Sequence, residues 1–598
     1  MMDGGQPLTT ASFDTVSRKV GPTGHISTGS TFDVRFDSAK MFMHTGSRPS
    51  HFNLLGWAYG PTVRGINVKS SYLWSGVNFA GYALPFTQVF LRPMLSDANA
   101  GFRAIPNAGL PAAPRPVLPS SVPQHLDWGV RNVRIASDDP DSMGNSPVLG
   151  LAQIGNTLYV GGKFQTVQHF STGATAHQPW LAAFDIRSGN WISSFHPTLD
   201  GAVFDLIAAP DGTLLVGGNF TNINGAAHTA GLAKLDPATG AVVVGWNVSL
   251  TGARFGEQHA YARSLDVRGP WVYVAGGFNG VDGGPSSTAL AAGGAARVSL
   301  ADGTPDITWH PFFDFAPSDI IASADGNRVY VAGAFNHTGV SNVMNFLSIG
   351  FAILRADDAT SVTGLGPVHL NNPGHPEQLA VTEYGSEVFH GGNQHWLASY
   401  DSSAFGFRNG ASMGPRGDVQ SIAGMYGLVF AGCHCLGYSL HVPAVGQADR
   451  VDRLNWMGAW NPTTFDRVEA FEPQWTMAGT GEGVWRIMAD SDNCMWTASD
   501  VIQGATTSDH LGGIARFCPG DTTAPSVPRM MKRIGTKLVW AASTDNVPGP
   551  LRYEILRNDR VVAVTTTRAF TPKTHGRYFI RAIDSAGNIG ATTRVINS

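Results

Sequence analysis

The sequence predicts an all-β protein, on three observations. Its 598 residues include 72 glycines and 36 prolines, and charged residues make up only 14% of the chain, against about 25% in ordinary soluble proteins. The hydrophobic fraction is 43%, with 32 Phe and 15 Trp, which is enough to bury sizeable cores and excludes wholesale disorder. The third observation is an internal repeat with the period-two alternation of β-strands.

The repeat is clearest in four glycine-containing heptapeptides. They are Leu158–Phe164, Leu214–Phe220, Val272–Phe278 and Val329–Phe335, whose closing phenylalanines are 56, 58 and 57 residues apart. Weaker copies follow near residues 388, 429 and 495, so seven units begin near residues 148, 203, 262, 317, 377, 419 and 483. The signature residues are Gly161, Gly162, Phe164, Gly217, Gly218, Phe220, Gly276, Phe278, Gly333, Phe335, Gly391 and Gly392.

Each unit predicts a small sheet of four antiparallel strands. Apolar residues alternate along it, and Asp-Gly and Ala-Thr-Gly turns separate the strands. One such sheet cannot bury both faces, so the units must stack, and a closed ring leaves fewer exposed edges than an open stack. The sequence therefore predicts a seven-bladed β-propeller, although the degenerate late repeats also fit six or eight blades. We expect the Gly-Gly pair where blades crowd together near the axis.

The repeat resembles a known family. Tyr-Val-Gly-Gly-x-Phe, followed by Leu-Ala-x-Phe/Leu-Asp-x-x-Thr/Ser-Gly, is similar to the delta-60 repeat propellers of actinobacterial surface proteins, over about residues 148–525. Cys433-His-Cys435 and Ala515–Asp521 resemble the closing part of those proteins. His390 and Ser499 depart from the pattern, which leaves the strand register of the fifth and seventh units open.

Three further regions flank the predicted propeller (148–520). Residues 521–598 resemble a fibronectin type III domain, with Trp540 on an early strand and Tyr578 opening a late one, as in small β-sandwiches. Residues 106–147 form the expected connector, in which six prolines between residues 106 and 123 predict an extended chain. Within it, Leu126–Ile135 is a candidate for the strand that closes the ring. Residues 1–105 alternate like β-strands and form the expected N-terminal anchoring domain.

The four cysteines, Cys433, Cys435, Cys494 and Cys518, lie within the last two units. They fit two disulfides, in any of three connectivities, that staple the closing blades. Free thiols, or a zinc site made with His434, are the alternatives. No metal-type CxxC spacing is present.

Other chemical motifs are weak, and we expect no enzyme activity and no cofactor. Gly410-Ala-Ser412-Met-Gly414 matches a nucleophile elbow, but Pro415 follows where the elbow needs a helix. The acidic stretches Asp138–Asn145 and Asp490–Asn493 offer oxygen ligands for calcium without fitting the twelve-residue calcium loop, so solvated turns are the simpler interpretation. Arg416-Gly-Asp418 is interpreted as a turn.

Composition also narrows the class of partner. A net charge of −4 argues against nucleic acid or an anionic membrane as the main partner. The longest apolar stretch, Phe79–Leu91, is too short to span a bilayer, and the first residues lack the pattern of a secretory signal.

The leading functional hypothesis is a structural and binding component of a bacteriophage tail or tail tip, extracellular after lysis of the host. The fibronectin-like module and the actinobacterial resemblance motivate it, because such modules are common on phage tails. Residues 1–105 would contact other tail proteins in a multi-subunit assembly, and the propeller would face a host-envelope glycan or protein. A secreted or cell-surface bacterial adhesin is one alternative. A polysaccharide-active propeller enzyme, with carboxylates from different blades gathered over the central channel, is the other.

Overall fold

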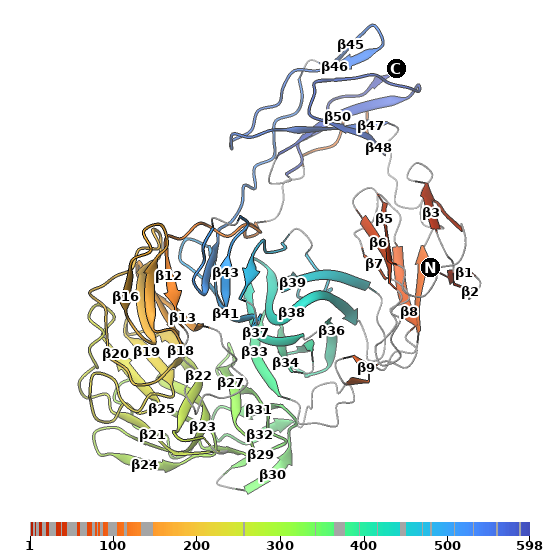
Figure 1. Cartoon of the computed structure of the whole chain (residues 1–598). Helices are drawn as coiled ribbons and strands as arrows, with labels where there is room; N and C mark the ends of the chain where they lie inside the picture. Colours follow the sequence, from red (N-terminus) through yellow and green to blue (C-terminus); the bar gives the residue numbers. More distant parts are fainter. Residues whose placement is uncertain are drawn as a thin grey trace.

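The computed structural model shows an all-β chain made of small antiparallel sheets, with no helix among the described residues (Figure 1). It describes strands within residues 2–93, and residues 105–597 apart from 113–116, 133–146, 255–256, 341–342, 364–376, 394, 415–416, 443–449, 469–470, 479–480, 507–508, 530, 558–559 and 585–587. In that part of the chain no helix is long and apolar enough to cross a membrane.

Seven sheets begin within one residue of the seven starts expected from the repeats. Their first strands are β13 (Val148–Ile154), β18 (Val203–Ala208), β22 (Tyr261–Arg268), β27 (Pro317–Ala322), β33 (Gln378–Tyr384), β37 (Asp418–Met425) and β41 (Val484–Ala489). Each pairs with a second strand: β14 (Thr157–Gly162), β19 (Leu214–Gly218), β23 (Trp271–Gly283), β28 (Arg328–Gly333), β34 (Glu387–Gly392), β38 (Leu428–Val442) and β42 (Met495–Ser499).

The third strands continue the antiparallel order. They are β17 (Leu181–Asp185), β20 (Leu232–Leu235), β25 (Ala295–Ser299), β31 (Phe351–Arg355), β35 (Trp396–Asp401), β39 (Arg450–Trp460) and β44 (Ile514–Phe517). The fifth and sixth sheets are joined, because β36 (Phe407–Gly414) pairs with both β35 and β38. Further outer strands are β12 (Trp128–Arg131), β15 (Thr166–His169), β16 (Thr175–His177), β21 (Val248–Ala253), β24 (Thr288–Ala291), β26 (Pro311–Phe313), β29 (His337–Val340), β30 (Val343–Leu347), β32 (Ser361–Thr363), β40 (Thr476–Met477) and β43 (Val501–Gln503).

The first strands contact one another in cyclic order. β13 contacts β18, each following first strand contacts the next, and β41 returns to β13. Hydrophobic cores lie between neighbouring sheets, and one of them unites Val148 and Leu158 of the first sheet with Trp496 of the seventh. Burial between sheets is the main stabilising term, since a sheet exposes both faces unless a neighbour covers each.

The two glycines of each signature pair are crowded by different neighbours. A Cβ on Gly161 would lie 2.4 Å from Val203 of the next sheet, as expected for crowding between sheets. A Cβ on Gly162 would instead lie 1.9 Å from the carbonyl oxygen of Pro147, just before the first strand of its own sheet. Gly217 and Gly218 repeat this division. The second glycine is therefore required by packing within its own sheet, which the sequence interpretation did not include. The phenylalanines Phe164, Phe220, Phe278 and Phe335 are fully buried.

We call the seven sheets in cyclic contact the ring. Residues upstream of the first sheet lie between the seventh sheet and the first unit. Ser120 N donates to Cys518 O and Gln124 N donates to Arg516 O, so this segment runs beside β44 of the seventh sheet. Further along, β12 pairs with β15 of the first repeat unit, and Val130 N donates to Gly512 O. The segment beside β44 lies just upstream of the Leu126–Ile135 candidate. The described part of that candidate pairs with the first unit and also bonds Gly512 of the last unit.

The C-terminal module contains two sheets around one core. One holds β45 (Lys532–Ile534), β46 (Lys537–Val539) and β49 (Ala569–Phe570), and the other holds β47 (Arg552–Arg557), β48 (Arg560–Thr565), β50 (Arg577–Ile583) and β51 (Ile596–Asn597). Leu538, Trp540, Tyr553, Tyr578 and Ile580 fill the space between them.

The expected connector touches this module as well. Ile105 packs on Leu556 and Phe579, Leu110 N donates to Thr592 Oγ1 at 2.6 Å, and Val595 N donates to Asn107 O. Two segments of chain therefore run between the ring and the C-terminal module, one before the first sheet and one after the last (Figure 1).

The N-terminal region is described only as strands. These are β1 (Met2–Asp3), β2 (Gln6–Pro7), β3 (Ala11–Asp14), β4 (Lys19–Pro22), β5 (Thr31–Phe36), β6 (Ala39–His44), β7 (Trp57–Tyr59), β8 (Val68–Leu73), β9 (Asn78–Phe79), β10 (Tyr82–Ala83) and β11 (Gln88–Pro93). They form small antiparallel sheets, of which β5-β6-β7 has three strands.

Candidate functional site

All seven first strands have a register shift at the same place. The residues at these shifts surround the centre of the ring, and we call this group the axial site. In each sheet the pairing of first and second strand skips one residue, which is the pattern of a β-bulge and turns side chains out of the ladder. The skipped residues are Leu149, Phe204, Arg263, Ser318, Leu379, Gln420 and Trp485, and the residues after them are Gly150, Asp205, Ser264, Asp319, Ala380, Ser421 and Arg486.

Thirteen of these fourteen residues, all except Gly150, line one cavity of about 580 Å³. Arg263 of the third sheet lies over the Trp485 ring of the seventh, 5.4 Å from its centroid. Trp485 Nε1 and Gln420 Oε1 are buried here without a hydrogen-bond partner among the described residues. The cavity is thus large enough for several waters or a small polar ligand, and Arg263 and Trp485 meet across it.

Two aspartates at the bulges each join their own sheet to the sheet that follows. Asp205 Oδ2 accepts a hydrogen bond from Leu265 N of the third sheet at 2.9 Å. Asp319 Oδ2 accepts one from Val381 N of the fifth sheet at 2.8 Å, and Ser264 Oγ donates to its other oxygen at 2.6 Å.

Asp266 and Ser421 make comparable links. Asp266, two residues past the bulge, accepts a hydrogen bond from Ala322 N at 2.7 Å. Ser421 Oγ donates to Val484 O of the seventh sheet at 2.8 Å. The polar groups around the axis are therefore engaged in joining neighbouring sheets.

Charge at the axis is balanced by arginine. Arg486 lies 3.5 Å from Asp205 Oδ1, and the nearby carboxylates of Asp205 and Asp319 raise the pKa of its guanidinium. Burial raises the pKa of Asp205, Asp266 and Asp319, because removing water penalises the charged carboxylate. Burial lowers the pKa of Arg263 for the same reason.

These carboxylates gather as a polysaccharide-active enzyme would need, but their oxygens are already occupied. Asp205 and Asp319 each accept hydrogen bonds from two backbone N–H groups. General acid–base chemistry requires a carboxyl within reach of the proton that it transfers. The arrangement holds neighbouring sheets together, and both Asp205 and Asp319 are engaged in these bonds.

A second hollow, of about 800 Å³, lies between the third and fourth sheets and is rich in arginine. Its lining includes Arg268, Arg297, Arg328, Arg355, Trp271 and Asp357. Arg297 stacks on Trp271 at 4.6 Å and pairs with Asp306, whereas Arg268 and Arg355 are exposed. We call this hollow the basic cleft.

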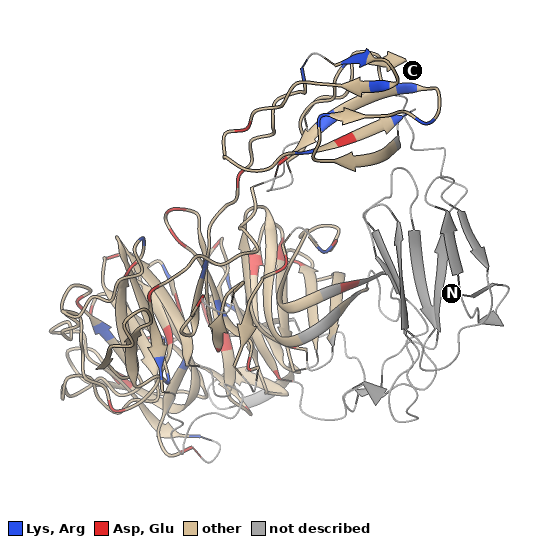
Figure 2. Cartoon of the chain, turned by 45° about the horizontal axis from the view of Figure 1, so that its top comes forward, with Lys and Arg blue, Asp and Glu red and all other residues tan. Residues whose placement is uncertain are grey.

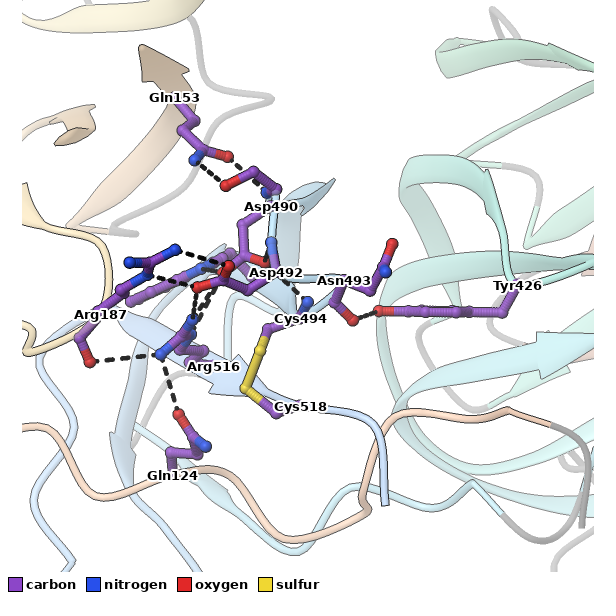
Figure 3. The surroundings of a disulfide bond; sticks show 12 residues. Gln124, Gln153, Arg187, Tyr426, Asp490, Asp492, Asn493, Cys494, Arg516 and Cys518 are labelled. Carbon is purple, nitrogen blue, oxygen red and sulfur yellow. Dashed lines mark hydrogen bonds and ion pairs between the residues drawn. A yellow bond between two sulfur atoms is a disulfide. The ribbon is translucent and has the colours of Figure 1, made fainter. Parts of the chain in front are cut away.

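The four candidate cysteines form two disulfides, Cys433–Cys435 and Cys494–Cys518, and no free cysteine is present among the described residues. Cys433–Cys435 lies where β38 shifts its pairing with β39, between Gly432 and Leu436. Cys494–Cys518 joins adjacent strands of the seventh sheet (Figure 3). The thiolates needed for the zinc alternative are therefore not present.

The acidic stretch Asp490–Asn493 is a contact point of the ring and not a calcium loop. Asp490 accepts hydrogen bonds from Asp492 N and Cys494 N and pairs with Arg516 at 3.0 Å. Asp492 pairs with Arg187 of the first unit at 2.9 Å (Figure 3). The pairing with Arg187 and Arg516 holds the pKa of Asp492 below its usual range. The solvated-turn interpretation of this stretch missed these arginines.

The same stretch also reaches the sixth sheet and the first unit through uncharged contacts. Tyr426 OH donates to Asn493 O, and Gln153 of the first unit bonds Ser491. The other acidic stretch, Asp138–Asn145, lies outside the described residues.

The structure also places Ser412 of the nucleophile-elbow match and Asp418 of the Arg-Gly-Asp tripeptide. Ser412 lies inside β36, opposite Trp396, with no helix after it, so the nucleophile-elbow context is absent there. Asp418 begins β37 and lies 3.2 Å from His395.

Sequence reasoning missed the axial aspartates and the basic cleft. The aspartates carried a signal, because Asp205 and Asp319 occupy the same place in their repeats, each directly before an apolar residue of a first strand. The cleft carried no such signal, since its four arginines come from four different strands of two sheets.

Comparisons with known proteins give partial similarities. No family model matches the chain. Exoglucanase B of Cellulomonas fimi is 38% identical over 90 residues, which cover 13% of this chain and 8% of that enzyme, so the chain spans less than a tenth of this relative. Among solved structures, the computationally designed Ika8 protein aligns over 62% of this chain and 96% of its own, with 11% identity and a TM-score of 0.34. The chain is thus similar to a short stretch of one enzyme, and no family membership follows.

Proposed function

We propose that residues 148–520 form a seven-bladed β-propeller and that the C-terminal module is of the fibronectin type III kind. Seven equivalent register shifts and the cyclic contacts of the first strands support the blade number. The two-sheet arrangement supports the second assignment, as does the hydrogen bond from Tyr578 OH to Thr574 O at 2.8 Å, because a tyrosine bonded a few residues upstream is typical of such sandwiches.

We propose further that the chain is a non-catalytic structural and binding component of a bacteriophage tail or tail tip, with its ring and C-terminal module facing a host envelope. The observation that carries the non-catalytic part is the use of the axial carboxylates. Asp205, Asp266 and Asp319 each accept a backbone N–H of the following sheet. A tail component needs a stable scaffold and a surface for a ligand. The hydrogen bonds that join neighbouring sheets support the first role, and the basic cleft is our candidate for the second.

The basic cleft is the binding surface that we propose, with an acidic envelope glycan as its ligand. Arginine recognises carboxylate and phosphate groups with paired hydrogen bonds, and Trp271 offers an aromatic face beside them. Figure 2 shows acidic and basic residues spread over the ring, so a cleft lined by four arginines is a local feature. Similarity to part of an exoglucanase is consistent with a chain that works near polysaccharide.

Two experiments test this proposal. Mass spectrometry of purified phage particles is expected to find the chain in the tail. Its absence from particles, together with its presence on bacterial cell walls, would favour the cell-surface adhesin instead. Incubation with envelope polysaccharide is expected to give no new reducing ends, and their appearance would establish the enzyme alternative.

The cleft has its own test, with a matched control. The variant Arg268→Gln/Arg355→Gln is expected to weaken binding to acidic envelope glycans at least tenfold, measured by glycan pull-down at physiological salt. Arg533→Gln/Arg552→Gln removes the same charge from exposed positions of the C-terminal module and is expected to bind normally. Equal binding by both variants would rule out the cleft as the site.

A further inference from the structure

Three aspartates meet where the chain enters the C-terminal module. Asp521 lies in the linker that follows β44, Asp545 lies between β46 and β47, and Asp584 comes directly after β50. One carboxylate oxygen from each lies within 4.8 Å of the others. Three segments that are distant in sequence thus place three acidic groups at one point.

Two of the oxygens are buried but accept no hydrogen bond from the residues that the structure describes. They are Asp521 Oδ2 and Asp545 Oδ1. The other oxygen of Asp521 accepts from Thr523 N at 2.8 Å and Asn546 Nδ2 at 3.0 Å. Proteins seldom bury carboxylate oxygens without partners, because the lost hydration is not replaced. These two oxygens therefore indicate a ligand that binds them.

Asp584 adds a buried charge to the same point. It is 1% exposed, and it accepts hydrogen bonds from Asn588 N at 2.8 Å and Asn588 Nδ2 at 2.7 Å. Within the described chain none of the three aspartates forms an ion pair with lysine, arginine or histidine. In agreement with this, burial and the neighbouring Asp521 and Asp584 raise the pKa of Asp545.

The spacing fits a calcium ion. Calcium binds oxygen ligands at about 2.3–2.6 Å, so ligands of one ion are at most about 5 Å apart, and three oxygens that all lie within 4.8 Å of one another can share one such ion. Magnesium needs shorter distances and near-octahedral geometry, and it usually keeps several waters. Ligands from three separate loops suit the more flexible coordination of calcium.

We propose that Asp521, Asp545 and Asp584 bind one Ca²⁺ ion, and that this ion fixes the linker to the C-terminal module. The position of Asp521 in the linker determines what the bound ion would do. Asp521 is three residues from Cys518 of the ring, and Gly520 N donates to Leu118 O of the parallel connection. Asn588 Nδ2 also donates to Asp521 O at 2.7 Å. The ion thus holds the linker where it leaves the ring and sets the direction of the module.

Isothermal titration of the full chain, stripped of metal with EDTA, tests binding. We expect one Ca²⁺ per chain, with at least tenfold weaker binding of Mg²⁺. Asp545→Asn, at a partly exposed position, is expected to weaken Ca²⁺ at least tenfold without unfolding the module. Asp358→Asn, at an exposed position of the ring, is the matched control and is expected to leave binding unchanged.

Several outcomes would overturn the proposal. Absence of Ca²⁺ binding at millimolar concentration excludes the site, and equal affinity for Mg²⁺ excludes the calcium assignment. Unchanged binding in Asp545→Asn places the ion elsewhere.

Limited proteolysis tests the role at the linker. We expect EDTA to speed cleavage within residues 519–531 at least threefold and to leave cleavage within the ring unchanged. Equal linker cleavage with and without Ca²⁺ would exclude the positioning role. Neither experiment depends on glycan binding, so failure of the proposed function leaves this result intact.

Discussion

The middle of the ring and its closing point join neighbouring sheets by different means. Between the second and fifth sheets, single aspartates accept a backbone N–H across each boundary. At the boundary between the seventh and first sheets, Asp492 pairs with the exposed Arg187 of the first unit, beside the buried pair Arg516–Asp490 and a disulfide that both lie within the seventh sheet (Figure 3).

The difference follows from chain connectivity. Consecutive sheets are tethered by a short link, so little entropy is lost when they pack together. The seventh and first sheets are separated by the whole ring, and bringing them together is a long-range closure. The buried pair and the disulfide hold the seventh sheet in the arrangement that meets the first sheet, and we expect this closing sheet to be the more sensitive to mutation.

The largest expected effect is at the buried pair of the seventh sheet. Asp490→Asn leaves Arg516, whose side chain is 7% exposed, with only the longer contact to Asp492 at 3.7 Å, and breaking a buried pair costs about 3–5 kcal/mol. Urea unfolding followed by tryptophan fluorescence is the measurement. A loss no larger than that of Asp319→Ala would contradict the stronger role of the closing point.

The second largest loss of stability is expected when the disulfide of the seventh sheet is removed. Cys494→Ser/Cys518→Ser opens a loop with a sequence separation of 24 residues, for which the chain-entropy model gives about 3 kcal/mol. Cys433→Ser/Cys435→Ser is the matched control, since its separation is 2 residues and its loop entropy is smaller. Equal shifts of the thermal midpoint in the two variants would contradict this ranking.

An axial aspartate is expected to matter less. Asp319→Ala leaves Val381 N–H without its acceptor and Ile320 N–H with only the longer bond to Ser264 Oγ at 3.3 Å, which costs about 1–3 kcal/mol. The fifth sheet has Ala380 at the equivalent position, so the ring tolerates alanine there.

The cost of Asp319→Ala is expected to depend on pH. Burial raises the pKa of Asp319 in the folded state, so the native chain keeps this proton after the unfolded chain has lost it. The contribution of Asp319 is complete below the unfolded pKa, near 4, and falls as pH rises toward the folded pKa. We therefore expect a larger stability loss at pH 4 than at pH 7, measured by urea unfolding at both values. The reverse order would contradict the direction of the pKa shift.

The smallest effect is expected at the exposed closing pair. Arg187→Ala removes the bond to Asp492, in which the Arg187 side chain is 63% exposed, and solvent and salt screen such pairs. We expect no measurable change in thermal midpoint at 0.15 M salt. A shift as large as that of Asp490→Asn would show that the closing contacts act as one network.

The strands of the ring could be predicted from the sequence, because the pattern that marks them spans only a few residues. The Gly-Gly-x-Phe signature and the alternating apolar residues placed seven first strands within one residue. It did not reach the bulges, because a register shift depends on the partner strand. The cysteines were identified as disulfide candidates, whereas their pairing depended on which strands are adjacent. Arg187 gave no signal, since its partner Asp492 is 305 residues away.

The sequence by itself determined that this chain is all-β, that seven units repeat along it, and where each unit begins. These properties follow from turn residues and period-two alternation, which act over a few residues. Tertiary structure alone decided which side chains meet at the axis, how the ring closes, that residues 105–110 pack on the C-terminal module, and that Asp521, Asp545 and Asp584 converge. Such contacts join residues tens to hundreds of positions apart, and only the packing of sheets against one another brings them together.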